Sequence, residues 1–388
     1  MTSKKKVLIS GAGIAGLLTY IYLDRSKYEM TLIEKGEQFR SVGYAITIWS
    51  CGYDLLKRTL MRRGAYENRF IKLKRTLMLN ESTFPESLYS LKDLGYIVDR
   101  EAFHDMLLAE ARNMEGRMIL DTAIPSTVVR DGKHIVTLST GQNDAYDLVV
   151  VAEGISSLTR SGCFEGVGIS PSDYAVEYAE IERIPMLEGE NVVFGINNMT
   201  GVLMTSPTSA MIAHFFFAKE PEYAAQRDVM REGLEKMLVR IYGPQCRPVY
   251  RGTTRVFELK DVHVPNSHAN RMILLGDAAH GRLPVLGVGT TLATEDAFYL
   301  ARSLNQLDGD SWSGRIEILL EEFSRARNKR VEQLYALQDV VIKNSLPRAN
   351  AVRKEYGPFA KRMFNTLGIL SNRLFTVFFR RAVSPKFV

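Results

Sequence analysis

A glycine-rich hexapeptide near the start of the chain has the spacing of a dinucleotide-binding turn. Residues 11–16 read GAGIAG, so glycines stand at Gly11, Gly13 and Gly16, and Ala15 precedes the third. Between a strand and a helix, the first glycine permits a tight turn and the second lets the backbone approach a pyrophosphate. The third allows close helix packing, and the N–H groups at the helix start favour a phosphate. A turn without a ligand is the alternative interpretation.

An acidic side chain follows at the position that such a unit requires. Hydrophobic patterning predicts a buried strand over residues 7–10, a helix over 15–24 and a second strand over 30–34. Glu34 ends the second strand, 18 residues after Gly16, where its carboxylate can accept hydrogen bonds from an adenosine ribose. This βαβ unit is predicted to bind a dinucleotide, and by itself it leaves NAD and FAD open.

A second motif distinguishes between these cofactors. Residues 273–280 read ILLGDAAH. Behind them come a proline, two glycines and an acidic pair: Pro284, Gly287, Gly289, Glu295 and Asp296. This segment resembles the GDAAH segment of the group A flavin monooxygenases, the p-hydroxybenzoate hydroxylase-like family. The resemblance implies that Asp277 hydrogen-bonds the ribityl chain of FAD, and that the glycines after Pro284 let backbone N–H groups meet the flavin ring.

Two further segments match the same family. Residues 147–154 read DLVVVAEG and are continued by Ser157 and Arg160, which resembles the motif that helps to organise FAD and NAD(P)H. Arg100 matches the arginine that approaches the FAD pyrophosphate. Arg40, with Gly43, matches the segment after the second strand. The resemblance extends over about residues 5–305, with its motifs in the family's order.

Three positions depart from the family pattern. Glu153 stands where the family has aspartate, which keeps the charge on a longer side chain and makes the NAD(P)H role less secure than the FAD role. Val288 and Thr291 replace a glutamine and an asparagine of the glycine loop, so two amide groups beside the flavin are lost.

The strand and helix pattern predicts an α/β protein whose Rossmann-like FAD-binding domain carries an inserted antiparallel sheet. Alternating strands are expected at residues 175–181, 191–196, 201–206 and 210–217, with a helix at 225–242. We divide the chain into a first part of the FAD-binding domain (1–172), a substrate domain (173–265), the return of the FAD-binding domain (266–340) and a basic helical C-terminal segment (341–388).

The resemblance implies a monooxygenase, either a hydroxylase or an epoxidase. NAD(P)H would reduce the flavin as a transient co-substrate, and dioxygen would form a flavin C4a-hydroperoxide that oxidises an apolar or aromatic small molecule. The alternatives are an FAD-dependent reductase or cyclase of an isoprenoid-type substrate, and a catalytically silent binding protein with the same fold. A flavin halogenase is disfavoured because its WxWxIP signature is absent from a chain whose only tryptophans are Trp49 and Trp312.

No single acid or base can be assigned to catalysis from the sequence. His280 lies inside the second motif and is better interpreted as a packing and hydrogen-bonding residue than as a catalytic base. Four aromatic side chains are candidates for a substrate pocket: Tyr44, Trp49, His214 and Phe216. An ordinary role in the hydrophobic core is the alternative for all four.

Composition limits the other classes of function. Cys51, Cys163 and Cys246 are an odd, scattered set, which suggests neither disulfides nor a metal site and fits a cytoplasmic protein. The net charge is +6, but residues 343–388 hold ten Lys or Arg against one acid, so residues 1–342 carry 6 − 9 = −3. Nucleic-acid binding is therefore not expected. The apolar run at residues 7–23 superficially resembles a signal peptide, which its three glycines argue against. Oligomeric state stays open.

The C-terminal segment combines apolar and basic residues. Between residues 364 and 379 nine apolar side chains crowd together, and the basic residues in and around this stretch are Lys361, Arg362, Arg373, Arg380, Arg381 and Lys386. A basic amphipathic helix of this kind can lie on an anionic membrane surface, and we expect peripheral membrane association as one possibility. Packing of the same apolar face on the protein body is the other.

Overall fold

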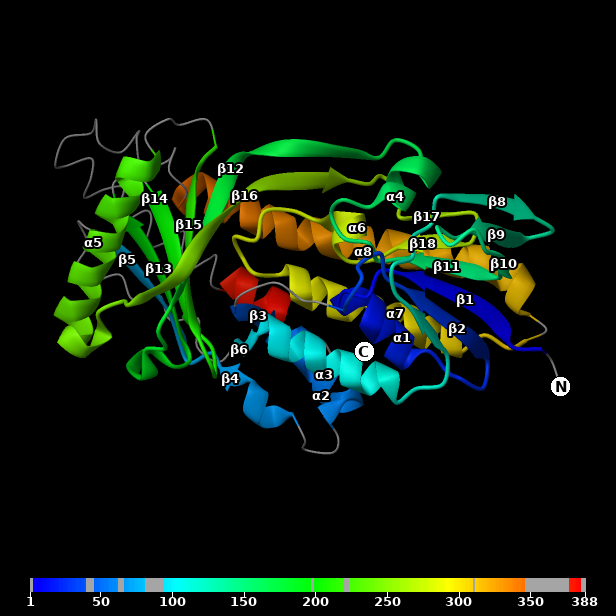
Figure 1. The fold of residues 1–388 in the computed structure, drawn as a ribbon, viewed down its shortest axis with the longest axis horizontal. Helices are drawn as coiled ribbons and strands as arrows, with labels where there is room; N and C mark the ends of the chain where they lie inside the picture. Colours follow the sequence, from blue (N-terminus) through cyan, green and yellow to red (C-terminus); the bar gives the residue numbers. More distant parts are fainter. Residues whose placement is uncertain are drawn as a thin grey trace.

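The computed structural model describes residues 3–39, 45–61, 66–80, 94–196, 199–218, 223–309, 311–345 and 377–384. Figure 1 shows two large sheets at opposite ends of the molecule, with the strands β12 and β16 running from one end toward the other. The predicted α/β class with a second sheet inserted into the chain is confirmed. Arg40, Gly43 and Tyr44 lie outside the described residues.

The first sheet is the Rossmann-like one. Its order is β17 (His268–Ala269), β18 (Met272–Leu274), β11 (Leu148–Val151), β1 (Lys5–Ser10), β2 (Tyr28–Ile33) and β7 (Arg117–Ile119). Every pairing is parallel except that of β17 with β18. All four residues of β11 are buried, as expected for a parallel strand that is covered on both faces.

Helices cover one face of this sheet and a small sheet covers the other. The helical face carries α1 (Ile14–Tyr22), α3 (Arg100–Arg112), α7 (Gly289–Asn305) and the start of α8 (Trp312–Ser345). The other face packs on β8 (Ser126–Arg130), β9 (Lys133–Thr137) and β10 (Asn143–Tyr146). The hairpin turn that joins β8 to β9 lies at Asp131 and Gly132, both of which have positive φ.

Shorter elements complete the FAD-binding part. A second small sheet has the order β3 (Ala45–Trp49), β6 (Gly95–Asp99) and β4 (Ile71–Lys72), and α2 (Ser50–Thr59) follows β3. Two short helices belong to the sequence motifs: α4 (Leu158–Cys163) follows the segment 147–154, and α6 (Asp277–His280) lies in the GDAAH segment. Of the described 3-10 helices, η2 (Glu67–Arg69) belongs to this part, whereas η3 (Pro185–Leu187) and η4 (Pro244–Cys246) lie within residues 173–265.

The second large sheet has features that the sequence pattern did not show. Its order is β16 (Tyr250–His263), β12 (Gly168–Ile181), β15 (Ala210–Phe217), β14 (Met199–Thr205), β13 (Glu190–Ile196) and β5 (Arg75–Asn80). The first five strands are antiparallel: four of them correspond to the predicted strands, and β16 was not predicted. The sixth strand, β5, pairs with β13 in parallel. The paired residues of β5 and β13 lie about 115 positions apart in the chain, so the alternation of residues within each strand could not reveal the pairing. The helix α5 (Tyr223–Tyr242) covers one face of this sheet.

The chain ends in a helical turn that packs on the body. Residues 377–383 are helical, and Phe379 and Val383 are fully buried. The Phe379 ring meets the Trp49 ring edge-on, with 4.7 Å between centroids. Val377 and Phe378 are exposed, and the rest of the predicted amphipathic stretch lies outside the described residues. Within the described ranges, no helix has the length and apolar character needed to cross a membrane.

Candidate active site

The glycine turn after β1 has the geometry of a phosphate-binding turn. Gly11 has φ +102°, and a Cβ on it would lie 2.4 Å from the carbonyl oxygen of Ala152 on the neighbouring strand end. A Cβ on Gly16 would lie 1.9 Å from the carbonyl oxygen of Gly11. Gly13, directly before α1, is different, because a Cβ there would meet nothing within 4 Å. The first and third glycines are thus required by close packing, whereas the second leaves open space at the helix N-terminus, where a pyrophosphate fits.

Two side chains hold the backbone on either side of Ala12 in this turn. Glu34 accepts a hydrogen bond from the Ala12 N–H (2.8 Å) and another from the Gly36 N–H (3.0 Å). The buried His104 contacts the Ala12 carbonyl through Nε2 (2.9 Å). In a planar trans peptide the N–H points away from the preceding carbonyl, so His104 turns the Gly13 N–H toward the opposite side. Glu34 keeps a free lone pair on each oxygen for a ribose. His104 could not be assigned a role from the sequence, because its partner is a backbone atom.

The second motif meets the first at the carboxyl edge of the parallel sheet. Gly276 has φ +58°, and a Cβ there would lie 3.2 Å from the Cβ of Ala15. Asp277 begins α6 and is exposed, and it lies beside Gly289, the first residue of α7. Gly287 has φ +60° between Pro284 and that helix. Ligands of open α/β sheets bind at this edge, so the predicted FAD residues are brought together where a dinucleotide can lie.

Glu153 is occupied by its own chain. Its carboxylate accepts hydrogen bonds from Ser10 Oγ (2.6 Å), Ser157 Oγ (2.7 Å), and the Oγ1 and backbone N–H of Thr159 (2.6 and 3.2 Å). These four contacts use the oxygens of the longer side chain to join the end of β1 to the start of α4. The geometry therefore favours a bracing role for Glu153 over the cofactor contact expected from the sequence.

Arg160 connects the two later motifs. It is fully buried, and its guanidinium donates to the carbonyl oxygens of Ile155 (2.7 Å) and Ala278 (3.0 Å). Burial lowers the pKa of Arg160, only partly countered by Glu153. Because Ala278 follows Asp277, this arginine helps to fix the segment that the resemblance assigns to the ribityl chain.

A buried chain of charges supports the same segment from α7 and α8. Asp296 accepts from the Gly276 N–H (2.9 Å), contacts His280 Nε2 (2.7 Å) and accepts from Arg327 Nε (2.7 Å). Burial alone would raise the pKa of Asp296, but Arg327 and His280 outweigh it and hold this pKa well below its usual value. Asp296 therefore stays ionised. His280 has the packing and hydrogen-bonding position predicted for it, while Arg327 was not singled out by the sequence.

The two departures in the glycine loop serve packing. Thr291 is buried, and its Oγ1 accepts from the Trp49 backbone N–H (3.0 Å), which ties β3 to α7. Trp49 Nε1 donates to the Leu286 carbonyl (3.0 Å). Val288 is buried in the apolar cluster between the two large sheets. Trp49 thus supports the glycine loop through this hydrogen bond, and its ring packs on Phe379. It therefore does not project into open space.

Two of the predicted pocket residues face the wrong way. His214 is fully buried and contacts Glu177 through Nδ1 (3.1 Å), on the face of the sheet that α5 covers. Phe216 lies two residues further along the same strand, so it shares that face. The neighbouring Phe215 packs toward the glycine loop instead. The alternation of side chains along β15 could be recognised in the sequence. Which alternate set faces the glycine loop could not, because a shift of one residue exchanges the two faces of the strand.

Arg100 and its neighbour Asp99 lie where the two sheets meet. Arg100 is exposed at the first position of α3, so its guanidinium is accessible to an anion. Asp99 accepts hydrogen bonds from Ser209 Oγ (2.9 Å) and from the hydroxyls of Ser206 and Thr208, which precede β15. This contact joins the FAD-binding part to the second sheet, and no local signal in the sequence indicated it.

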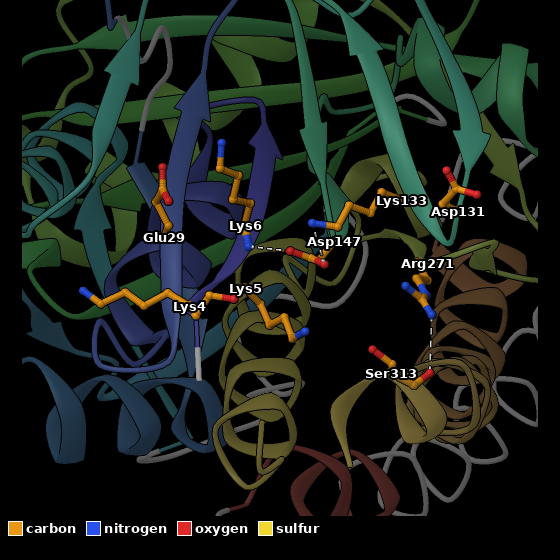
Figure 2. A pocket seen from close by; sticks show the side chains of 10 residues that line it. Lys4, Lys5, Lys6, Glu29, Asp131, Lys133, Asp147, Arg271 and Ser313 are labelled. Atoms are coloured by element: carbon orange, nitrogen blue, oxygen red, sulfur yellow. Dashed lines mark hydrogen bonds and ion pairs between the residues drawn. The ribbon is translucent and has the colours of Figure 1, made fainter. Parts of the chain in front are cut away.

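A cavity of about 620 Å³ lies at the other edge of the parallel sheet (Figure 2). Its cations already have partners: Lys6 pairs with Asp144 (3.3 Å) and Lys133 with Asp147 (3.5 Å). Arg271 donates to backbone carbonyls, and Lys5 lies over the Trp312 ring. The cavity is at the amino ends of the strands, away from the glycine turn, so it is not the candidate active site.

Comparisons with known proteins agree with this geometry. A family model for the FAD binding domain matches residues 4–337, so the chain belongs to that family. A flavin-dependent monooxygenase from an unknown prokaryotic organism is 25% identical over 330 residues, covering 78% of this chain and 82% of the relative. The 2-heptyl-3-hydroxy-4(1H)-quinolone synthase of Pseudomonas aeruginosa (strain UCBPP-PA14) is 28% identical over 316 residues, covering 76% and 80%. The structure of Klebsiella pneumoniae HpxO complexed with FAD and uric acid has a TM-score of 0.70 at 19% identity, covering 99% and 97%.

The family assignment made from the motifs is thereby confirmed. The protein is an FAD-dependent monooxygenase of the p-hydroxybenzoate hydroxylase-like family, with FAD as its cofactor. NAD(P)H is the co-substrate typical of that family.

Proposed function

We propose that this enzyme uses NAD(P)H and dioxygen to hydroxylate or epoxidise an apolar or aromatic small molecule. One observation carries the proposal: the glycine loop before α7 packs against an apolar face of the second sheet. Leu283 and Val288 of the loop form one buried cluster with Met211 and Phe215 of β15. A substrate that reaches the flavin edge of this loop would therefore meet these apolar side chains, which suits an apolar compound.

The protein's part in this reaction is binding and placement. FAD, when bound, supplies the redox chemistry with NAD(P)H and dioxygen. The open face at Gly13 and the start of α1 would hold the pyrophosphate, and Asp277 would hold the ribityl chain. The Gly287 N–H donates to the Pro284 carbonyl (3.1 Å), so the backbone N–H of Gly289 at the start of α7 would orient the ring. The apolar cluster would exclude water from the reacting atoms.

The histidines named from the sequence do not supply an acid or base to this mechanism. Burial lowers the pKa of His214, only partly offset by Glu177, and the ring lies on the α5 face. His280 is bound to the ionised Asp296. We infer that turnover rests on placement of substrate over the flavin, with no proton transfer from these rings.

The experiment that tests this proposal follows the reduction of the flavin and the incorporation of oxygen from dioxygen into the product. The purified protein should be yellow, and FAD should leave it on denaturation. Stopped-flow absorbance with NADH and with NADPH, across a panel from alkyl quinolones to simple phenols, should show bleaching of the flavin that a bound substrate accelerates. With ¹⁸O₂ the product should gain one labelled oxygen atom. Bleaching without label in any product would indicate the reductase or cyclase alternative, and failure of both nicotinamides to bleach the flavin would indicate the silent protein.

We also infer that any membrane contact of the C-terminal segment rests on residues other than Phe379 and Val383. Phe379 and Val383 are buried on the body and are not available to a bilayer. The sequence between them and α8 still supplies Lys361, Arg362 and Arg373 with their apolar neighbours. Sedimentation with anionic liposomes at low and high salt should pellet the full chain only at low salt, and a truncation after Leu346 should stay in solution. A full chain that stays in the supernatant at low salt contradicts this inference.

A further inference from the structure

The long helix α8 binds the segment 276–282 directly at two points and indirectly, through Asp296 of α7, at a third. Arg327 reaches it through Asp296, which accepts from the Gly276 N–H (2.9 Å). Tyr335, two turns further along α8, donates its hydroxyl to the His280 carbonyl. Asp339, one turn beyond, accepts from Arg282 (2.8 Å). These contacts lie at the beginning, middle and end of the segment that contains Asp277.

Arg327 is the most deeply held of these residues. Its side chain is about nine-tenths buried, and it donates to both members of the acidic pair on α7: Asp296 through Nε (2.7 Å) and Glu295 through Nη1 (2.9 Å). Burial alone would lower the pKa of Arg327, but the two carboxylates outweigh it. Arg330 donates to both carboxylate oxygens of Glu295 (2.8 and 3.0 Å). The acidic pair is therefore fixed in one orientation from α8.

The backbone at this segment needs such support. Gly276 has φ +58° and ψ −141°, so the chain turns sharply before Asp277. α6 is a single turn of four residues, and the Asp277 side chain is exposed. Neighbouring side chains therefore do not hold its carboxylate in place by packing against it. The direction in which that carboxylate points depends on the peptide that Asp296 binds and on the helix turn that Tyr335 binds.

We propose that Arg327 and Tyr335 are positioning residues for FAD: from α8, they fix the Gly276 peptide and the α6 turn so that the Asp277 carboxylate meets the ribityl chain. This inference rests on the proposed role of Asp277, but not on the reaction. Neither residue contacts the cofactor-binding face directly, and their action passes through Asp296 and through the His280 carbonyl.

FAD affinity is the measurement that tests this role, by titration of the apoprotein with FAD and recording of flavin fluorescence. Arg327→Met should weaken FAD binding by at least about tenfold, since it leaves Asp296 without its charged partner, whereas Arg327→Lys should recover part of that loss. Tyr335→Phe removes one hydroxyl and should weaken binding by about threefold. The matched control is Arg325→Met, because Arg325 lies on the same helix and is exposed, with only a surface pair to Glu321. It should change FAD affinity less than about twofold.

A second measurement separates positioning from general destabilisation. Asp277→Asn retains the geometry and weakens FAD binding on its own, so it can be combined with Tyr335→Phe in a double-mutant cycle. Coupled residues should give a combined loss smaller than the product of the two single losses. Multiplicative losses, or an Arg327→Met variant that binds FAD as tightly as Arg325→Met, would overturn the proposal. Because affinity is read without NAD(P)H or substrate, this result stands whether or not the monooxygenation proposal holds.

Discussion

Two buried groups of charged residues in this protein differ in what they hold. At α7 and α8, Asp296, Glu295 and Arg327 make contacts of 2.7–2.9 Å, and Asp296 also binds a backbone N–H of the flavin segment. Beneath α5, Glu177 contacts His214 at 3.1 Å and Arg231 at 3.7 Å. His214 Nε2 has no partner among the described residues. Buried charge alone does not identify a functional site; the backbone that the first group fixes makes it relevant to the cofactor.

The largest effect should come from Asp277, the acid that the first group positions. Asp277→Ala should yield protein without FAD, because its carboxylate would be the direct ligand of the ribityl chain. Glu34→Ala should weaken binding by about 1.5 to 3 kcal/mol, the value of a charge-assisted hydrogen bond. FAD content after gel filtration measures both. Asp308→Ala, an exposed acid after α7, is the control and should retain FAD. A fully loaded Asp277→Ala variant would show that this carboxylate does not bind the cofactor.

The glycine turn offers a comparison between space for ligand and space for packing. Gly13→Ala should leave the apoprotein folded but lose most FAD, since its methyl group would enter the open face at the start of α1. Gly16→Ala should destabilise the fold itself by about 3 kcal/mol or more, because its methyl group would overlap the Gly11 carbonyl. Thermal unfolding of the apoproteins and FAD titration separate these outcomes. Equal unfolding temperatures for the two variants would contradict the assignment.

Neutral substitutions can distinguish the effects of the two buried charged groups on stability and on FAD affinity. Asp296→Asn should destabilise the protein and also weaken FAD binding, since Arg327 loses its partner beside the flavin segment. Glu177→Gln should destabilise the protein by a similar amount, about 2 to 4 kcal/mol, because it leaves arginines beside a neutral group. Its FAD affinity should stay near the wild-type value. Urea unfolding of the apoproteins and FAD titration give the two quantities, and a large loss of FAD affinity in Glu177→Gln would remove the distinction.

The smallest effect concerns pH. The folded pKa values of Asp296 and Glu295 lie below their usual values, so their contribution to stability is present above the unfolded pKa of about 4. It is lost as pH falls toward the folded pKa values, because the unfolded chain binds protons there first. The stability difference between wild type and Asp296→Asn should stay constant from pH 7 to about pH 5 and shrink below about pH 4. Urea unfolding of both apoproteins across this range measures it, and a constant difference at pH 3 would contradict the depressed pKa.

Local patterns in the sequence determined the cofactor-binding half of this protein. The turn at residues 11–16 depends on neighbours a few residues away, because backbone conformation at glycines is a local property. Glu34 followed from its spacing after that turn, and the GDAAH segment from its resemblance to the family. The same holds for the hairpin at Asp131 and for the alternating strands of the second sheet. Such features are set by local sterics and by the two-residue period of side chains along a strand, so the sequence alone predicts them.

Only the tertiary structure decided which of these residues act together and which face of a strand each side chain occupies. His214 and Phe216 lie under α5 and Phe215 faces the glycine loop, although all three are neighbours in sequence. Glu153 is taken up by hydroxyls of the chain, and His104 and Arg327 hold the two cofactor segments from helices far away in sequence. The physical reason is that register, burial and long-range hydrogen bonds depend on partners brought together by folding, for which a linear pattern carries no signal.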